Sequence, residues 1–256
     1  MVGDVVGKPG LLAVKKLLPR VIAEHKVDFV VANGENAAGG IGITPDNAKD
    51  LMHWGVTCVT TGNHVWRQRE IRDYIARENR LLRPLNFGEN QPGEGIGRYE
   101  TPGGIAVGVI NLAGRIFMNP ADNPFKAADR ALEVLSDVKI RLVDIHAEAT
   151  SEKRAMGQYL AGRVTAVVGT HTHVQTADSH ILEPGTAYIT DMGMTGPHDS
   201  VIGMRKDLVL ERFVNGMPNS FQPAKGNARF QGVIIHADRS TGAALDIQRL
   251  DIPVGA

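Results

Sequence analysis

The chain has 256 residues, of which 43% are hydrophobic and 22% charged, and its lysines and arginines balance its aspartates and glutamates at 28 each. This length can bury a sizeable core, and the zero net charge gives no electrostatic footprint for duplex nucleic acid or an anionic membrane. The single cysteine, Cys58, excludes an internal disulfide and a cysteine-based zinc site, and its apolar neighbours favour a buried thiol. The apolar runs are far shorter than the roughly 20 residues of a membrane span. The N-terminal residues lack the pattern of a signal peptide, so we expect a cytoplasmic protein.

Short apolar runs alternate along the chain with amphipathic, helix-like stretches. The first such stretch, 11–25, is interrupted by Pro19, which predicts a kink or two short helices. The alternation as a whole indicates an α/β fold with at least partly parallel strands, and the absence of a repeat or linker favours one domain over 1–256. Runs rich in valine and isoleucine predict strands at 29–32, 56–60, 105–112, 138–145, 164–169, 187–190, 232–236 and 244–250. Helices are predicted at 46–54, 66–78, 125–135 and 151–161.

Three local signals refine these elements. Ser151 is the expected N-cap of the last helix. The last two apolar runs have no long helix between them and predict an antiparallel hairpin that turns at 240–242. A first strand that ends at Asp4 would have only two or three residues where about five are usual. We therefore expect a truncated first strand and a natural chain that begins upstream of Met1, which an intact-mass measurement of the native protein would test.

Polar side chains that can bind metal stand directly after apolar runs at five places. Because the carboxyl ends of parallel strands meet at one edge of an open sheet, we expect these places to converge in the folded protein. The residues are Asp4, Glu35 and Asn36, Asn63 and His64, His146, and His171 and His173.

The donor set is oxygen and imidazole nitrogen without thiolate, which suits iron, manganese, zinc or cobalt better than calcium. Even without His64, the seven remaining residues are too many ligands for one ion, but they match two ions bridged by a carboxylate about 3.5–4 Å apart. Taken singly, each residue has an ordinary alternative, because a histidine after a strand is usually structural and Gly62-Asn63 or Asn33-Gly34 can be a plain turn. Only the combination predicts a two-metal centre. The other histidines are interpreted as structural: His25, His53, His180, His198 and His236.

Five motifs together resemble those of the calcineurin-like metallophosphoesterases. They are Gly3-Asp4, Gly34-Glu35-Asn36, Gly62-Asn63-His64, His146 and Gly169-Thr170-His171-Thr172-His173. Over nearly its whole length the chain is most similar to the YmdB-like bacterial phosphodiesterases of that superfamily, through stretches 4–7, 35–40, 146–153 and 195–200. The resemblance implies a four-layer αββα sandwich of two mixed sheets flanked by helices.

The resemblance also implies a ligand set, with iron or manganese as the favoured metals and zinc or cobalt as alternatives. One ion would be held by Asp4, Glu35, Asn36 and His173, and the other by Glu35, Asn63, His146 and His171. Glu35 would bridge them, and His64 would be the general acid. The chain departs from the wider superfamily at Val6, at Glu35 and at Val65, which replace a histidine, an aspartate and an acidic residue. The group that orients His64 is therefore not visible in the sequence.

The activity implied by the resemblance is phosphodiester hydrolysis, in this branch of 2′,3′-cyclic nucleotides. Our hypothesis is that a hydroxide activated by the two metals attacks phosphorus in line, while His64 protonates the leaving alkoxide. The expected partner is a small phosphate ester, with homo-oligomerisation as an option and no role for duplex nucleic acid or membrane.

Two other functions stay open. A metal-containing nucleotide-binding regulator would turn over poorly and could use segment 113–125, with Arg115 and Phe117, for recognition or oligomerisation. A phosphomonoesterase such as a 5′-nucleotidase would need extra positive charge for a dianionic phosphate, for which Arg115, Lys153 and Arg205 are the candidates.

Overall fold

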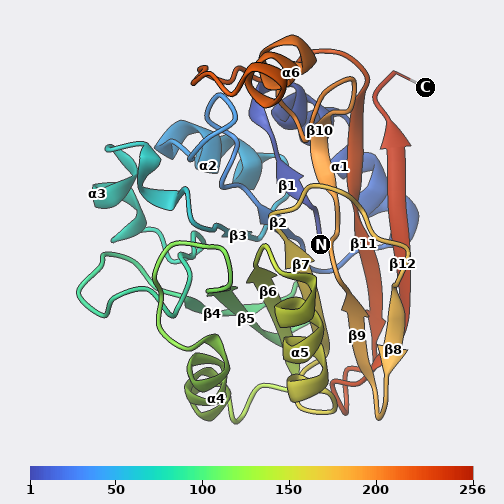
Figure 1. Ribbon diagram of the computed structural model, residues 1–256. Coiled ribbons are helices and arrows are strands. Elements are labelled where there is room, and N and C mark those ends of the chain that lie inside the picture. Colours follow the sequence, from blue (N-terminus) through green and yellow to red (C-terminus); the bar gives the residue numbers. More distant parts are fainter. Residues whose placement is uncertain (256) are drawn as a thin grey trace.

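The computed structural model describes residues 1–255 and consists of helices and two β-sheets (Figure 1). The strands are β1 Asp4–Val5, β2 Val31–Asn33, β3 Cys58–Thr60, β4 Ile96–Glu100, β5 Ala106–Ala113, β6 Ile140–His146, β7 Ala166–Thr170, β8 His180–Leu182, β9 Thr186–Ile189, β10 Met194–Pro197, β11 Ala228–Ala237 and β12 Ala244–Pro253. The helices are α1 Gly7–His25, α2 Pro45–His53, α3 Ile71–Ile75, α4 Pro124–Val134, α5 Thr150–Leu160 and α6 Lys206–Asn215.

Both sheets contain parallel and antiparallel pairs. The first has the order β1-β10-β11-β12, and single bridges from Val2 to Ala32 and Gly232 bring the parallel pair β2-β3 alongside it. The second has the order β4-β5-β6-β7-β9-β8, with β5, β6, β7 and β9 parallel. The fold therefore confirms the predicted architecture of two mixed sheets with flanking helices.

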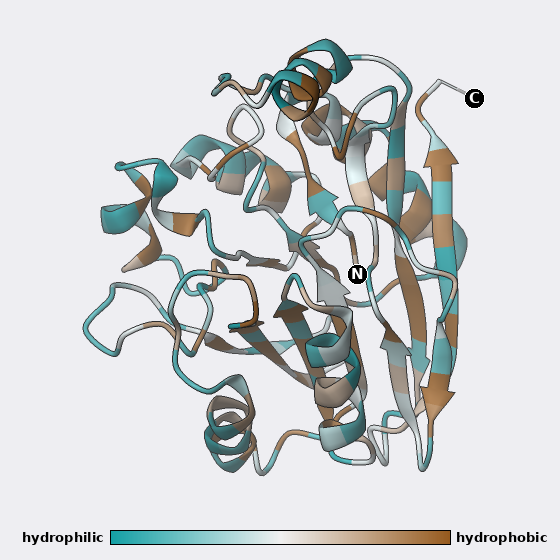
Figure 2. Cartoon of the chain, viewed as in Figure 1, coloured by the Kyte–Doolittle hydropathy of each residue, from teal (hydrophilic) through white to brown (hydrophobic). Residues whose placement is uncertain are grey.

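Apolar clusters separate the four layers. One joins α1 and α2 to the first sheet, with Leu18 and Leu51 among its fully buried members, and a second joins α4 and α5 to the second sheet, with Leu132 and Met156. A third lies between the sheets and includes the thiol of Cys58, whose burial raises its pKa to about 12. Figure 2 shows how hydrophobic residues concentrate along the strands. Because β5, β6 and β7 are covered on both faces, their sequences read as continuous apolar runs.

None of the helices within residues 1–255 is both long enough and apolar enough to cross a bilayer.

The eight apolar runs all contain a strand, but three shorter strands were not predicted: β4, β8 and β10. The helix α6 was not predicted either. The last two runs pair as the expected antiparallel hairpin, which closes where Gly242 donates to the carbonyl of Asp238. The first strand, β1, has the two residues that the sequence allowed for it, and it is held between β10 and the bridges at Val2.

Two local expectations are wrong and one is wrong in part. The helix α1 runs through Pro19 as one element and not as two short helices, because both Pro19 and Lys15 four residues earlier are on an exposed face where water can replace the lost hydrogen bond. A kink at Pro19 stays a prediction. The predicted helix 66–78 is a 3₁₀ turn at Val65–Arg67 followed by the short α3, since Gln68 between them is extended. Ser151 is not an N-cap, because α5 already begins at Thr150.

Candidate metal centre

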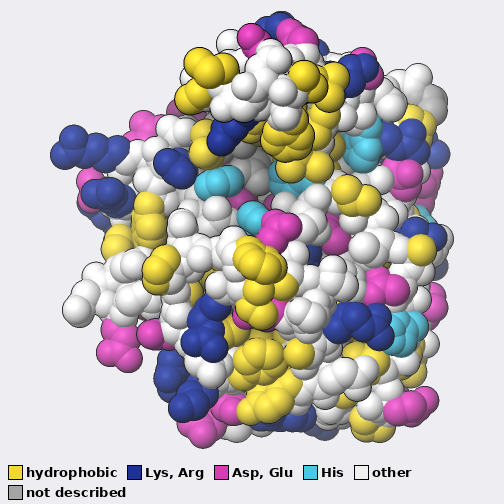
Figure 3. Space-filling view, viewed as in Figure 1, with side chains coloured by type: hydrophobic (Ala, Val, Ile, Leu, Met, Phe, Trp, Pro, Cys, Tyr) yellow, Lys and Arg dark blue, Asp and Glu magenta, His cyan; other side chains and the backbone are white. Residues whose placement is uncertain are grey.

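The predicted metal-binding residues converge on one edge of the molecule, where β1, β2, β3, β6 and β7 end. His146 is the last residue of β6, and its Nε2 atom lies at the centre of one group of donors. Glu35 Oε1 lies 2.9 Å from it, His171 Nδ1 3.0 Å and Asn63 Oδ1 3.1 Å. Figure 3 shows histidine and acidic side chains together on this face of the molecule.

A second group of donors lies around His173. Its Nε2 atom is 3.2 Å from Asn36 Nδ2 and 3.6 Å from Asp4 Oδ1. Asp4 also links the two groups, because its Oδ2 atom accepts a hydrogen bond of 3.1 Å from the backbone amide of His171. The structure therefore brings all seven predicted ligands together.

Each of the three imidazoles has one nitrogen engaged by a protein group and the other turned towards the donors. His146 Nδ1 lies 2.9 Å from Thr170 Oγ1, and His173 Nδ1 lies 2.9 Å from the carbonyl of Ile202. His171 Nε2 lies 3.1 Å from a carboxylate oxygen of Glu148. Such partners fix the tautomer and leave the opposite nitrogen with a lone pair for a metal.

This arrangement fits metal cations. His171 Nδ1 and His146 Nε2 face each other at 3.0 Å, a contact that requires a proton or a cation between the two nitrogens. Within residues 1–255, no hydrogen-bond partner reaches the buried Oδ1 atom of Asp4. A buried charged oxygen without a partner is costly, and a coordinated ion removes that cost. The carboxylates and imidazoles are also the donors that first-row transition metals prefer.

The carboxylates of the centre are ionised although they are fully buried. Burial by itself would raise the pKa of Glu35, but the neighbouring His146 and His64 hold that pKa well below its usual range. Burial likewise opposes ionisation of Asp4, and His173 and His146 lower the pKa of Asp4. For His171, burial and the adjacent His146 lower the pKa to about 3, so its imidazole is neutral and available as a ligand.

Gly62 gives the centre its close packing. A Cβ atom at this position would lie 2.3 Å from both His146 Nε2 and Glu35 Oε2. Glycine therefore allows the Gly62-Asn63-His64 turn to approach the donors, which explains the residue type in that motif.

His64 lies at the exposed rim of the centre, with 26% of its side chain accessible. Its orienting group is Asn36, whose Oδ1 atom lies 3.0 Å from His64 Nδ1. The backbone amide of His64 also donates to Glu35 Oε2 at 3.1 Å. In this orientation Asn36 directs its amide nitrogen, not its oxygen, towards His173. A ligand role for Asn36 requires the amide to turn by 180°, and it stays a prediction.

Sequence reasoning missed the groups that hold the ligands. Asp144 is fully buried on β6 and accepts hydrogen bonds from Thr170 Oγ1 at 2.7 Å, Thr60 Oγ1 at 2.5 Å and Asn33 Nδ2 at 3.0 Å. Burial raises its pKa to about 6. Because Thr170 in turn contacts His146, Asp144 orients this predicted ligand through Thr170. The sequence signals that could have found these groups are a charged residue inside the apolar run 138–145 and Glu148 two residues after His146.

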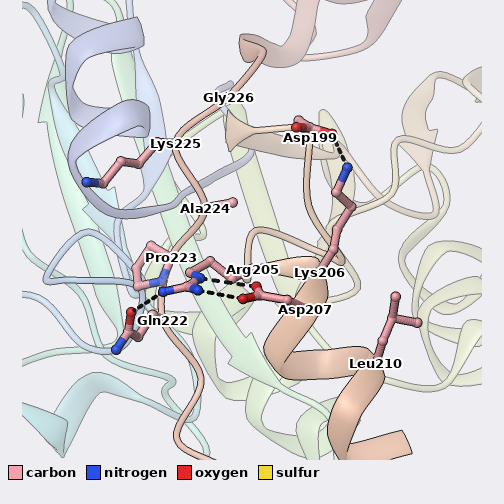
Figure 4. A pocket seen from close by; sticks show the side chains of 10 residues that line it. All are labelled: Asp199, Arg205, Lys206, Asp207, Leu210, Gln222, Pro223, Ala224, Lys225 and Gly226. Atoms are coloured by element: carbon pink, nitrogen blue, oxygen red, sulfur yellow. Dashed lines mark hydrogen bonds and ion pairs between the residues drawn. The ribbon is translucent and has the colours of Figure 1, made fainter. Parts of the chain in front are cut away.

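Two of the three candidate phosphate-binding cations are engaged elsewhere. Lys153 is fully buried, with Nζ 2.9 Å from Asp191. Arg205 binds both carboxylate oxygens of Asp207 and the side chain of Gln222 in a surface pocket that contains none of the predicted ligands (Figure 4). The interpretation of the buried Lys153 as a phosphate contact is therefore wrong, and that of Arg205, an exposed residue, stays a prediction. Arg115 is exposed and remains a candidate.

Metal uptake is expected to release a proton from His173. Burial would lower its pKa, but the adjacent Asp4 raises it from its ordinary 6.5 to about 9, so the metal-free protein carries this proton at pH 7. The proton stabilises the metal-free fold below about pH 6.5, and this contribution is lost as the pH rises through about 9. Apparent metal affinity should rise about tenfold per pH unit up to that value.

Calorimetry in two buffers of different ionisation enthalpy measures this release. His173→Gln is the control, since it should take up less metal and release about one proton fewer. Affinity that does not change between pH 6 and 8 would contradict the expected protonation of His173.

Comparison with known proteins agrees with this geometry. The chain is 46% identical over 250 residues to a 2′,3′-cyclic-nucleotide 2′-phosphodiesterase of Bacillus subtilis, covering 97% of this chain and 94% of the relative. A solved hypothetical protein of Thermus thermophilus superposes with a TM-score of 0.92 and 42% identity, covering 98% and 97% of the two chains. A novel phosphatase of Mycoplasma pneumoniae superposes with a TM-score of 0.92 and 34% sequence identity, covering 98% of this chain and 92% of that protein. The family model described as YmdB-like protein matches residues 1–250, and with this match the chain belongs to the YmdB-like family.

Proposed function

We propose that the protein is a metal-dependent phosphodiesterase that opens 2′,3′-cyclic nucleotides. The observation that carries the proposal is the convergence of three imidazole nitrogens on two buried carboxylates, with His64 at the exposed rim. The B. subtilis relative, named a 2′,3′-cyclic-nucleotide 2′-phosphodiesterase, supports the choice of substrate.

Each residue has a role in this proposal. Asp4, Glu35, Asn36 and His173 would hold one ion, and Glu35, Asn63, His146 and His171 the other. When bound, the two ions would supply a nucleophile at neutral pH and positive charge for the phosphoryl oxygens. His64 would donate its proton to the departing ribose oxygen. The contact of Asn36 Oδ1 with His64 Nδ1 belongs to the amide orientation in which Asn36 is not a metal ligand, so Asn36 would take one of the two roles at a time.

The ions are proposed to be iron or manganese, because the mixed oxygen and imidazole donors suit them and no thiolate is present in the group. Elemental analysis of the purified protein tests this. Assembly into a homo-oligomer and a cytoplasmic location stay predictions, which size-exclusion chromatography and cell fractionation would check.

The test of the function is a side-by-side assay. The protein, loaded with Fe²⁺ or Mn²⁺, is given 2′,3′-cyclic AMP, a linear dinucleotide and 5′-AMP. We expect fastest hydrolysis of the cyclic diester, with the 3′-monophosphate as product if the bond to O2′ is broken. A protein that binds no metal and hydrolyses none of these substrates with either ion added would overturn the proposal.

The same assay separates the two other functions. A phosphomonoesterase is disfavoured because Lys153 and Arg205 already have carboxylate partners, and it would show fastest hydrolysis of 5′-AMP. A nucleotide-binding regulator would bind 2′,3′-cyclic AMP tightly and leave it intact.

The segment after β5 is proposed to bind the nucleobase. It begins beside the metal centre, where the backbone amide of Gly114 donates a hydrogen bond of 2.9 Å to the carbonyl of His146. The carboxylate of Glu152 then accepts hydrogen bonds from the backbone amides of Arg115, at 3.0 Å, and Ile116, at 3.3 Å. The next residue, Phe117, has 89% of its surface exposed and a φ of 61°. An exposed aromatic ring three residues after Gly114, which contacts His146, can stack on a base of any sequence.

Phe117→Ala is expected to raise KM for 2′,3′-cyclic AMP about tenfold, since base stacking on an aromatic ring contributes about 1–3 kcal/mol. The rate on bis(p-nitrophenyl) phosphate, which has no base, should not change. Phe213→Ala is a matched control, because Phe213 on α6 is also exposed, at 74%. Equal KM changes in both variants, or a loss of rate on the baseless substrate, would contradict a role in base binding.

A further inference from the structure

The His-Thr-His segment has a backbone that its residue types rarely adopt. His171 has a φ of 94° and His173 a φ of 63°, both in the left-handed region that favours glycine. Such a conformation persists only where the surroundings impose it. Some group outside the imidazoles must therefore hold this backbone in place.

Asp4 holds one end of the segment through the backbone amide of His171. The group that holds its middle is the carboxylate of Asp191, which follows β9 and is fully buried. Its Oδ2 atom accepts hydrogen bonds from the backbone amide of Thr172, at 3.0 Å, and from the Thr172 hydroxyl, at 2.6 Å. Its Oδ1 atom accepts a hydrogen bond of 2.7 Å from the backbone amide of Gly193. Thr172 stands between the two histidines, so its attachment to Asp191 constrains the backbone on both sides.

The charge of Asp191 is matched by Lys153 of α5, which is also fully buried. Lys153 Nζ lies 2.9 Å from Asp191 Oδ2 and 3.0 Å from Thr172 Oγ1. Gly169 leaves the space for the lysine side chain, since a Cβ atom there would lie 2.8 Å from Lys153 Cδ. A buried ion pair needs both partners and their hydrogen bonds, and here those bonds include the Thr172 hydroxyl.

We propose that Lys153, Asp191 and Thr172 form a buried clamp that positions His171 and His173 for metal binding. The inference rests on the proposed function, which assigns these two histidines to different ions. One clamp would then set the geometry of both ions, although none of its three side chains is a proposed ligand. Lys153 and Asp191 are positioning residues in this role.

The test uses Thr172→Val, which removes the hydroxyl and keeps the shape of the side chain. Thr172→Ser restores the hydroxyl. Asp178→Asn is the control, because Asp178 is a similar carboxylate that holds Thr176 and Thr190 nearby without contacting Thr172. Truncation of Asp191 alone would leave a buried lysine charge and can prevent folding. The double variant Lys153→Met/Asp191→Asn removes both charges together.

Two readouts are independent of activity. The first is Mn²⁺ affinity of the metal-free protein by calorimetry, which should fall about tenfold in Thr172→Val and about 100-fold in the double variant, the range seen for groups that orient metal ligands. The second is hydrogen–deuterium exchange of the peptide 170–176, which should become faster in both. Thr172→Ser and Asp178→Asn should bind Mn²⁺ within about threefold of the wild type.

The outcomes separate this inference from the proposed function. Wild-type Mn²⁺ affinity in Thr172→Val, or an equal loss in Asp178→Asn, would overturn the clamp and leave the phosphodiesterase proposal untouched. A wild type that binds two ions but does not hydrolyse cyclic nucleotides, together with weakened binding in Thr172→Val, would overturn the function and support the clamp. A wild type that takes up no Mn²⁺ would overturn both.

Discussion

Glu35→Gln is expected to remove bound metal and hydrolysis together. Glu35 is fully buried, and its Oε1 atom lies 2.9 Å from His146 Nε2, in the middle of the proposed ligands. It is the only residue assigned to both ions. Glutamine has nearly the same shape but no negative charge, so two cations would face each other without the anion between them. A loss of about 4 kcal/mol of charge stabilisation corresponds to a rate about 10³-fold lower.

Elemental analysis and the rate on 2′,3′-cyclic AMP measure the two effects. Glu24→Gln, which changes an exposed glutamate on α1 paired with Arg20, controls for the loss of a charge. Glu148→Gln is a graded control, because it removes only the partner of His171 and should cost about 10–100-fold in metal affinity. If Glu35→Gln kept two ions per chain with wild-type affinity, Glu35 would not be the bridging ligand.

His64→Ala is expected to keep both metals and lose about 10²–10⁴ in rate on a cyclic nucleotide, the usual contribution of a general acid. The ribose oxygen is a poor leaving group and needs the proton. A p-nitrophenyl ester leaves as a stable anion, so its hydrolysis should fall much less. The difference between the two substrates, measured with metal content held equal, is the signature of proton donation.

The control for His64→Ala is His236→Ala, an exposed histidine on β11 that should behave as the wild type. Asn36→Asp tests the orienting contact, because an acidic residue would take the place of the amide oxygen that His64 Nδ1 contacts. Equal losses on the cyclic nucleotide and the p-nitrophenyl ester in His64→Ala would show that His64 binds substrate and does not donate the proton.

The α/β class of the fold and the location of the centre could be predicted because both depend on local patterns. A strand buried on both faces must be apolar, and the first polar residue after it marks the edge of the sheet. His146 and the residues that follow β2, β3 and β7 were found in this way. The pairing of the sheets and their helical cover rested on the family resemblance, because periodicity does not determine the order of strands.

The remaining features depend on contacts between residues far apart in the chain. Lys153 looked like a phosphate ligand until the structure showed its partner Asp191, which follows a different strand. Asp144 was hidden in an apolar run because its three donors come from other strands. The amphipathic pattern at 66–78 predicted one helix, but Gln68 instead donates to the carbonyl of Ile41 across a loop.

The proposed ligands come from both sheets, and this has a consequence for the fate of the protein in the cell. Asp4 lies on β1 of the first sheet and Glu35 follows β2 of the pair alongside it, whereas His146 ends β6 and His171 follows β7 of the second sheet. Bound metal would therefore link the two sheets. At a free metal concentration of about 100 times Kd, it would add about 2.7 kcal/mol to the free energy of unfolding. When iron or manganese is scarce, the chain should open more often and be degraded sooner. The amount of this protein would then follow the metal supply without any change in its synthesis, which pulse-chase labelling with and without a chelator would measure.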